Sequence, residues 1–90
     1  MTPEQKETFR VALLRVLEER GSDQFGISVV PIQIFLGQFG FRATKPEDIR
    51  LELQYLADKG LVASVGKTIS PENKAWRITA EGRDYTAQNP

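Results

Sequence analysis

The chain has 90 residues, 40% of them hydrophobic, which suffices for one domain around a single core. Its 12 Lys and Arg residues balance 12 Asp and Glu residues, so no whole-molecule attraction to a polyanion or a membrane surface is expected. Because the chain has no Cys and no His, it lacks disulfides, thiolate nucleophiles, imidazole bases and the usual soft-metal ligands, and we expect neither a metal nor a cofactor.

The first predicted element is an amphipathic helix that begins near Thr2 and ends near Arg20. Thr2 offers a capping hydroxyl, Pro3 suits the first helical position, and Gln5 can return a hydrogen bond to the cap. Gly21 marks the end of the helix. The buried stripe is formed by the apolar residues that recur at helical spacing: Phe9, Ala12, Leu13, Val16 and Leu17.

Two further aliphatic residues of this helix, Val11 and Leu14, lie off the stripe. One interpretation is that they widen the core-facing surface of the helix. The other is a homodimer in which Val11 and Leu14 meet a second subunit together with Tyr85 of the last helix.

A second helix is predicted to open near Ser28, after a turn-rich connector and a short strand at Ile27. Pro31 fits only the first turn of that helix. Its apolar residues point to nearly every side, so we expect a brief helix buried between two others; they are Ile32, Ile34, Phe35, Leu36 and Phe39. Gly37 and Gly40 weaken its end.

The clearest local signal begins a third helix at Thr44-Lys-Pro-Glu47. It combines a capping threonine, a first-turn proline and a glutamate that can bond back to the threonine N–H. Gly60 terminates the helix. The core-facing residues are predicted from their spacing: Ile49, Leu53, Leu56 and Ala57.

After Gly60 the apolar period changes toward two, which predicts strands at residues 61–65 and 75–78. The stretch between them contains Gly, Pro and Asn as turn formers, so the two strands form a hairpin with a long tip. A lone hairpin is marginal in water, and we therefore expect Trp76 and Ile78, or one of them with Val62, to pack on the helices. A last short helix follows Thr79 and carries Tyr85. The ordered core spans about residues 3–87, and residues 88–90 form a frayed tail.

This order of elements predicts an α+β fold, a small winged helix in one domain over residues 1–90. It comprises a three-helix bundle with a helix-turn-helix, a two- or three-stranded antiparallel hairpin as the wing, and a short C-terminal helix. The segments Leu56-Ala-Asp-Lys-Gly-Leu-Val62 and Trp76-Arg-Ile-Thr-Ala-Glu-Gly-Arg83 resemble the MarR and PadR regulator families, and the resemblance covers roughly residues 5–86. It implies that the third helix enters the major groove of double-stranded DNA and that the wing touches the neighbouring backbone.

The resemblance also implies the DNA-binding residues. The groove-facing positions carried over to the third helix are Lys45, Glu47, Asp48, Arg50, Leu51, Gln54 and Tyr55. Among these, Arg50 and Gln54 suit guanine and adenine edges. Phosphate contacts are assigned to the basic residues of the hairpin and of the turn before the third helix: Lys67, Lys74, Arg77, Arg42 and Lys45. For a single lysine the alternative is that it only solubilises the loop and protects the hairpin edge.

The third helix departs from those families in its first turn, where Glu47 and Asp48 carry negative charge. Such residues stabilise their own helix through its dipole but would repel a phosphate backbone. Leu51 and Tyr55 form a small apolar patch that could meet a thymine methyl group, a protein partner or a second subunit. The expected function is therefore a DNA-binding transcriptional regulator or accessory nucleic-acid-binding factor; the alternative is a winged-helix protein-interaction module that does not bind DNA.

Catalysis is not expected. The paired carboxylates at Glu18/Glu19 and Glu47/Asp48 are adjacent on helices, where neighbours point about 100° apart and do not converge on a substrate. No glycine-rich phosphate loop or cofactor fingerprint occurs. No signal peptide is recognisable and no apolar run approaches the ~20 residues of a membrane span, so a cytoplasmic protein without membrane attachment is expected.

Overall fold

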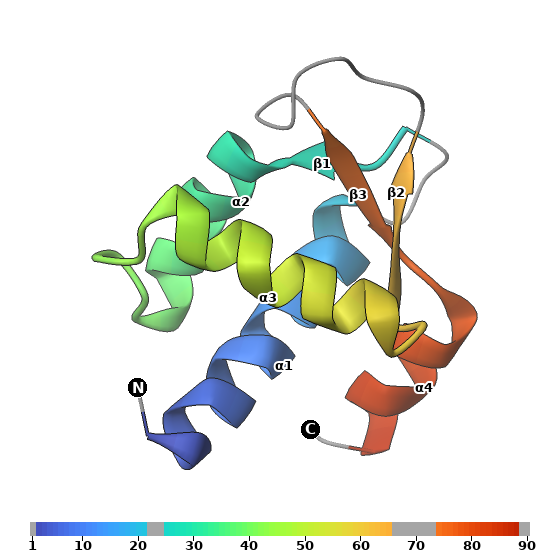
Figure 1. Cartoon of the computed structure of the whole chain (residues 1–90), viewed down its shortest axis with the longest axis horizontal. Helices are drawn as coiled ribbons and strands as arrows, with labels where there is room; N and C mark the ends of the chain where they lie inside the picture. The colour runs from blue at the N-terminus through green and yellow to red at the C-terminus, as the bar shows by residue number, and fades with distance from the viewer. Residues whose placement is uncertain (1, 22–24, 66–73, 89–90) are drawn as a thin grey trace.

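A computed structural model describes residues 2–21, 25–65 and 74–88, and in this part the chain forms four α-helices and a three-stranded antiparallel sheet (Figure 1). The predicted α+β class is confirmed. The elements are α1 (Pro3–Arg20), β1 (Ile27–Ser28), α2 (Val29–Leu36), the 3₁₀ helix η1 (Gly37–Phe39), α3 (Pro46–Asp58), β2 (Val62–Val65), β3 (Ala75–Ile78) and α4 (Ala80–Gln88). No helix in these residues is long and apolar enough to cross a lipid bilayer.

The start of α1 confirms the predicted cap. The Gln5 amide N–H donates to Thr2 Oγ1 at 3.1 Å, and the Thr2 amide N–H donates to the Gln5 side-chain oxygen at 3.0 Å. These two bonds satisfy donors that the first turn of a helix leaves unpaired. At the other end the Gly21 N–H donates to the Leu17 carbonyl at 2.7 Å, and the helix stops there as predicted.

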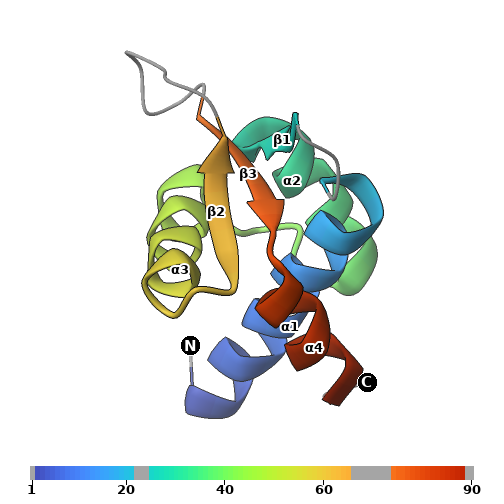
Figure 2. The same ribbon diagram turned by 90° about the vertical axis from the view of Figure 1, so that its right-hand side faces the viewer.

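The three strands lie in the order β1-β3-β2 (Figure 2). The predicted hairpin is present, with Val62 opposite Ile78, and β1 adds a third strand by pairing Ile27 with Trp76. Side chains alternate along β3, so that Trp76 and Ile78 are buried while Arg77 is exposed. In Figure 2, β2 lies beside α3 and β1 lies beside α2.

The core is shared by three helices and the sheet. Its residues are Phe9, Ala12, Leu13, Leu14, Val16 and Leu17 of α1, Val29, Ile32 and Leu36 of α2, Ile49, Leu53 and Leu56 of α3, and Val62, Trp76 and Ile78 of the strands. Leu14 is 0% exposed, so it widens the core-facing surface of α1. The homodimer predicted through Val11 and Leu14 is wrong to that extent, because a side chain inside the domain core cannot contact a second subunit.

Helix α2 packs against both α1 and α3, as predicted, but its apolar residues are not all buried between them. Ile34 is 68% exposed and Phe39 is 38% exposed. Only one stripe of this eight-residue helix is buried in the core, and it is formed by Val29, Ile32 and Leu36 at spacings of three and four. Any aliphatic residue outside that stripe then faces solvent.

The predicted cap of α3 is also wrong, although the helix begins within two residues of it. The N-cap residue is Lys45, and its side chain makes no capping hydrogen bond. Thr44 is buried, its hydroxyl donates to the Phe41 carbonyl at 3.0 Å, and its own carbonyl accepts a bond from the Gln33 side chain at 2.9 Å. Thr44 therefore stabilises the turn before α3, and its hydroxyl is not available to the first turn of the helix.

Hydrogen bonds of Thr79 hold the start of the last helix, α4, in place. Thr79 Oγ1 accepts the Gly82 N–H at 3.1 Å and donates to the Gly60 carbonyl at 2.7 Å, which joins the start of α4 to the end of α3. Helix α4 includes Gln88, the first residue of the predicted tail. Asn89 and Pro90 lie outside the described residues.

Candidate functional site

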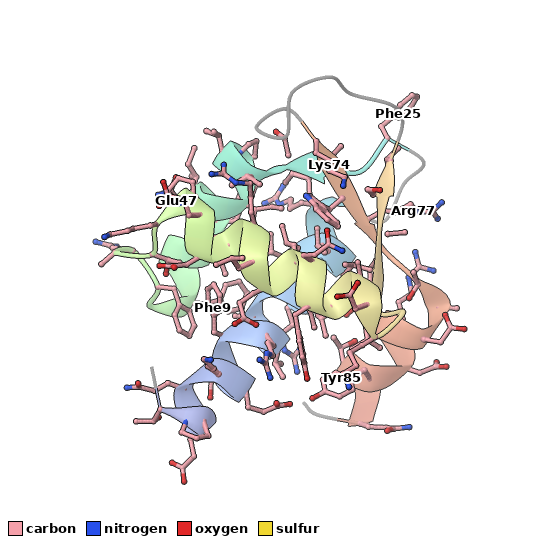
Figure 3. All side chains as sticks on the ribbon, viewed as in Figure 1. Phe9, Phe25, Glu47, Lys74, Arg77 and Tyr85 are labelled. Atoms are coloured by element: carbon pink, nitrogen blue, oxygen red, sulfur yellow. The ribbon has the colours of Figure 1, made fainter. Side chains whose placement is uncertain are left out.

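Most of the predicted DNA-binding residues lie on α3, which crosses the front of the molecule from Glu47 to the base of the hairpin (Figure 3). Ile49, Leu53 and Leu56 turn into the core, so the opposite side of the helix faces solvent. Leu51 is 69% exposed at the centre of that side, and Glu47 is exposed beside it.

One side of α3 packs toward α1, and we call it the α1-facing flank (Asp48, Glu52 and Tyr55). Its central contact is an ion pair in which Arg10 Nε donates to Glu52 Oε2 at 2.7 Å, with both side chains largely buried. The bond to Glu52 raises the pKa of Arg10 above its ordinary value. The positive charge of Arg10 therefore remains, and it neutralises one of the acids of α3.

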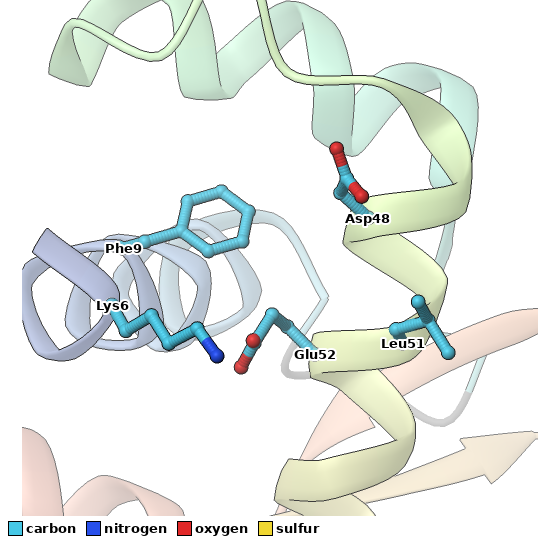
Figure 4. A pocket seen from close by; sticks show the side chains of 5 residues that line it. All are labelled: Lys6, Phe9, Asp48, Leu51 and Glu52. Carbon is cyan, nitrogen blue, oxygen red and sulfur yellow. The ribbon is translucent and has the colours of Figure 1, made fainter. Parts of the chain in front are cut away.

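A pocket opens between α1 and the first half of α3, lined by Lys6, Phe9, Asp48, Leu51 and Glu52 (Figure 4). Phe9 forms the apolar wall on α1, and the Lys6 side chain points toward Glu52. Asp48 lies on the opposite wall, and its carboxylate has no hydrogen-bond or ion-pair partner within the described ranges.

The two residues of the predicted Leu51/Tyr55 patch differ in what surrounds them: cations cover the Tyr55 ring, whereas the Leu51 side chain is uncovered. The guanidinium of Arg10 lies 3.9 Å from the centre of the Tyr55 ring, and the ammonium of Lys59 lies 5.6 Å from it. Cations over the face of a tyrosine are favourable, so this ring already has partners within its own chain. Leu51 is the part of the patch that presents an uncovered apolar side chain.

The other side of α3 carries Arg50 and Gln54, and we call it the open flank. Successive residues of a helix turn by about 100°, which places these two side chains on the side away from Glu52. Arg50 is half-buried and, among the residues described here, has no ion-pair partner. The exposed Gln54 amide donates to Asp58 Oδ1 at 3.2 Å.

The structure separates the two hairpin cations that it describes. Lys74 shares the Trp76 face of β3 and lies on the side of the hairpin next to α3, whereas Arg77 extends from the opposite side (Figure 3). The Lys74 ammonium lies 5.0 Å from the Trp76 ring centre. The Trp76 indole Nε1 is buried without a hydrogen-bond partner in the described residues. Lys67, the third predicted hairpin cation, lies outside them.

The two cations of the turn before α3 are also apart. Lys45 is exposed at the start of α3. Arg42 instead lines a second pocket over the end of α2, together with Gln33, Ile34, Gly37 and Gln38. The predicted site thus divides into Lys45, Arg50, Gln54 and Lys74 on or next to α3, and Arg42 and Arg77 elsewhere.

Sequence reasoning missed Arg10 and Ile34. The pairing of Arg10 with Glu52 joins residues 42 apart in the chain, and no local pattern indicates it. A signal for Ile34 did exist: with Val29, Ile32 and Leu36 as the core stripe of α2, the helical period places Val30 and Ile34 together on the outer side. No protein-family model, curated protein or solved structure matches the chain.

Proposed function

We propose that the domain is a winged helix that binds double-stranded DNA, as a transcriptional regulator or an accessory nucleic-acid-binding factor. Helix α3 enters the major groove, and the β2–β3 hairpin lies against the adjacent backbone. The order of helices and strands, with the short strand β1 closing the sheet beside the hairpin, supports this assignment.

The observation that carries the proposal is the separation of charge on α3. This helix has four acids and one arginine, which would oppose DNA binding if all were presented together. Two of the acids are turned toward α1: Glu52 is paired with Arg10, and Asp48 lines the pocket beside Phe9. The open flank therefore presents Arg50, which has no ion-pair partner in the described part of the chain. Lys74 lies on the side of the hairpin that is next to α3.

The chemistry of the open flank suits base reading. A guanidinium binds the two acceptors of guanine, and a glutamine amide binds the donor and acceptor of adenine. Gln54 must exchange its solvent-exposed bond to Asp58 for a base, and surface hydrogen bonds of this kind are replaced at small net cost. Lys45 and Lys74 are the phosphate-binding residues, and they position the helix without reading sequence.

The test is binding of a labelled duplex library, measured by fluorescence anisotropy at about 50 mM and about 200 mM salt. Affinity should fall steeply with salt. Arg50→Ala should relax sequence preference at one position by about 1–3 kcal/mol. Lys74→Ala should weaken all duplexes alike and reduce the salt slope by about one.

Arg77→Ala is the matched control, because it removes a cation of the same hairpin, but from the face turned away from α3. It should leave both affinity and salt slope close to those of the wild type. Equal loss for Lys74→Ala and Arg77→Ala would reject the proposed orientation of the hairpin. Equal binding by wild type and Arg50→Ala on every duplex would reject base reading by α3.

A further inference from the structure

Two exposed apolar surfaces lie outside the proposed DNA-binding residues. The first, the α2 surface, consists of Val30, Ile34 and Arg42. Val30 is 60% exposed and Ile34 is 68% exposed, four residues apart on the outer side of α2. Arg42 and Ile34 line the same pocket, so a cation lies beside the aliphatic side chains.

The α2 surface is basic as well as apolar. Residues 25–45 contain no Asp or Glu and two cations, Arg42 and Lys45. Arg42 has neither a hydrogen bond nor an ion pair within the described residues. A partner for this surface should therefore offer a carboxylate next to an apolar hollow.

The second surface is the pocket between α1 and α3, and we call it the α1–α3 groove (Lys6, Phe9, Asp48, Leu51 and Glu52). It offers that combination. Phe9 is fully buried at its wall, and Leu51 is 69% exposed at its rim. Glu52 is satisfied by Arg10, but the Asp48 carboxylate is unpaired among the described residues.

We propose that the α2 surface of one copy of this chain docks in the α1–α3 groove of a second copy. Ile34 then packs against the exposed Leu51, and Arg42 pairs with Asp48. Each surface alone leaves large aliphatic side chains in water, and the contact covers both. The complementary charges select this pairing over a contact of either surface with itself.

The contact joins two different surfaces, so copies can add head to tail, or two copies can exchange it about a two-fold axis, with each α2 surface in the other copy's groove. The head-to-tail arrangement leaves an empty α1–α3 groove to which a further copy adds, whereas the reciprocal arrangement closes at two chains. Arg50, Gln54 and Lys74 take no part in it. Leu51 and Asp48 lie on the helix that is proposed to enter the major groove, so the assembly is tested without DNA.

The test is sedimentation equilibrium of the whole chain without DNA, from about 10 μM to about 1 mM, the range in which weak contacts associate. The average mass of the wild type should rise above that of one chain as the concentration increases, to two chains for the reciprocal arrangement and beyond two for the head-to-tail arrangement. Ile34→Asp disables the α2 surface and Leu51→Asp disables the groove, so each variant alone should remain monomeric. An equimolar mixture of the two should form a complex of two chains and nothing larger, because one intact surface of each kind remains.

Two further measurements separate this contact from loss of folding and from non-specific association. Circular dichroism should report wild-type helix content for both variants, since both positions are exposed. Ala87→Asp, on the exposed side of α4, should assemble like the wild type. Arg42→Glu and Asp48→Lys should each weaken assembly about tenfold or more, and the double variant should restore it because the charges are exchanged.

Two results would overturn the proposal. They are a wild type that is monomeric at every concentration, and a mixture of Ile34→Asp and Leu51→Asp that stays monomeric. A double charge variant no better than either single variant would remove the Arg42–Asp48 pairing.

Discussion

Arg10 on α1 donates a 2.7 Å hydrogen bond from its Nε to the Glu52 carboxylate on α3, and the same guanidinium lies 3.9 Å from the centre of the Tyr55 ring. One side chain thus holds two residues on the same flank of α3. The burial of Ile49, Leu53 and Leu56 sets the rotation of α3 about its own axis, and this contact stabilises it. Arg50 and Gln54 lie on the opposite flank.

Glu52→Gln should lower the free energy of unfolding by about 1–3 kcal/mol, because it weakens a charged hydrogen bond that is largely shielded from water. Urea unfolding followed by circular dichroism measures the change. Glu19→Gln, the same change at an exposed residue of α1 with no ion pair in the described residues, is the control and should cost less than about 0.5 kcal/mol. A double-mutant cycle of Arg10→Ala with Glu52→Ala that gives no coupling energy would show that the pair contributes nothing.

Gly82→Ala should destabilise the domain by about 1–3 kcal/mol or more, because its new methyl group would lie 2.1 Å from the Leu61 carbonyl oxygen and 2.7 Å from Ile78 Cγ1. Backbone at that position cannot move without separating α4 from the hairpin. Gly37→Ala is the matched control: its methyl group meets only the flexible Arg42 side chain, and the backbone there is helical. Thermal unfolding that ranks the two variants equally would contradict the close approach of α4.

Stability should also depend on pH through Tyr85, whose hydroxyl donates to the Glu7 carboxylate and joins α4 to α1. This hydrogen bond, with burial, raises the pKa of Tyr85 above its ordinary value of 10.0. Since the folded pKa is the higher one, the contribution is complete below pH 10.0 and is lost as the pH rises through the folded value. The difference in unfolding free energy between wild type and Tyr85→Phe should therefore be constant below pH 10.0 and shrink above it. A difference that grows at high pH would contradict this.

Glu47→Gln should strengthen DNA binding by about 1 kcal/mol or less at low salt, because this exposed carboxylate is the acid of the first turn that is not turned toward α1. The gain should disappear as salt screens the charge. The same change removes a favourable interaction with the helix dipole and should cost about 0.3–1 kcal/mol of stability. Tighter binding that persists unchanged at high salt would point to a contact other than charge repulsion.

Local signals explain what the sequence could predict. The reciprocal cap at Thr2, the glycine after α1 and the change of apolar period after Gly60 each involve neighbouring residues, and the structure contains the elements that they predict. The pairing of β1 with β3 was not predictable in register, because it joins Ile27 to Trp76 across most of the chain.

The errors have a common physical origin in tertiary contacts. Thr44 has the sequence context of a helix cap, but its hydroxyl donates a hydrogen bond to the Phe41 carbonyl instead. Ile34 is a residue type usually found in the core, but only one stripe of α2 is buried and Ile34 lies outside it. In the candidate site, the residue types on α3 and its core-facing side could be predicted from the spacing, whereas the pairing of Glu52 with the distant Arg10 could not.

Backbone amide NMR during titration with a short random-sequence duplex, at about 20 mM and again at about 150 mM salt, tests the proposed DNA binding most directly. The amides of residues 45–58 and 74–77 should shift at low salt, and the shifts should fade as salt is added. The α2 surface should shift little at protein concentrations too low for assembly. Absence of any shift at low salt, or shifts confined to α1 and the α2 surface, would contradict DNA binding through α3 and the hairpin.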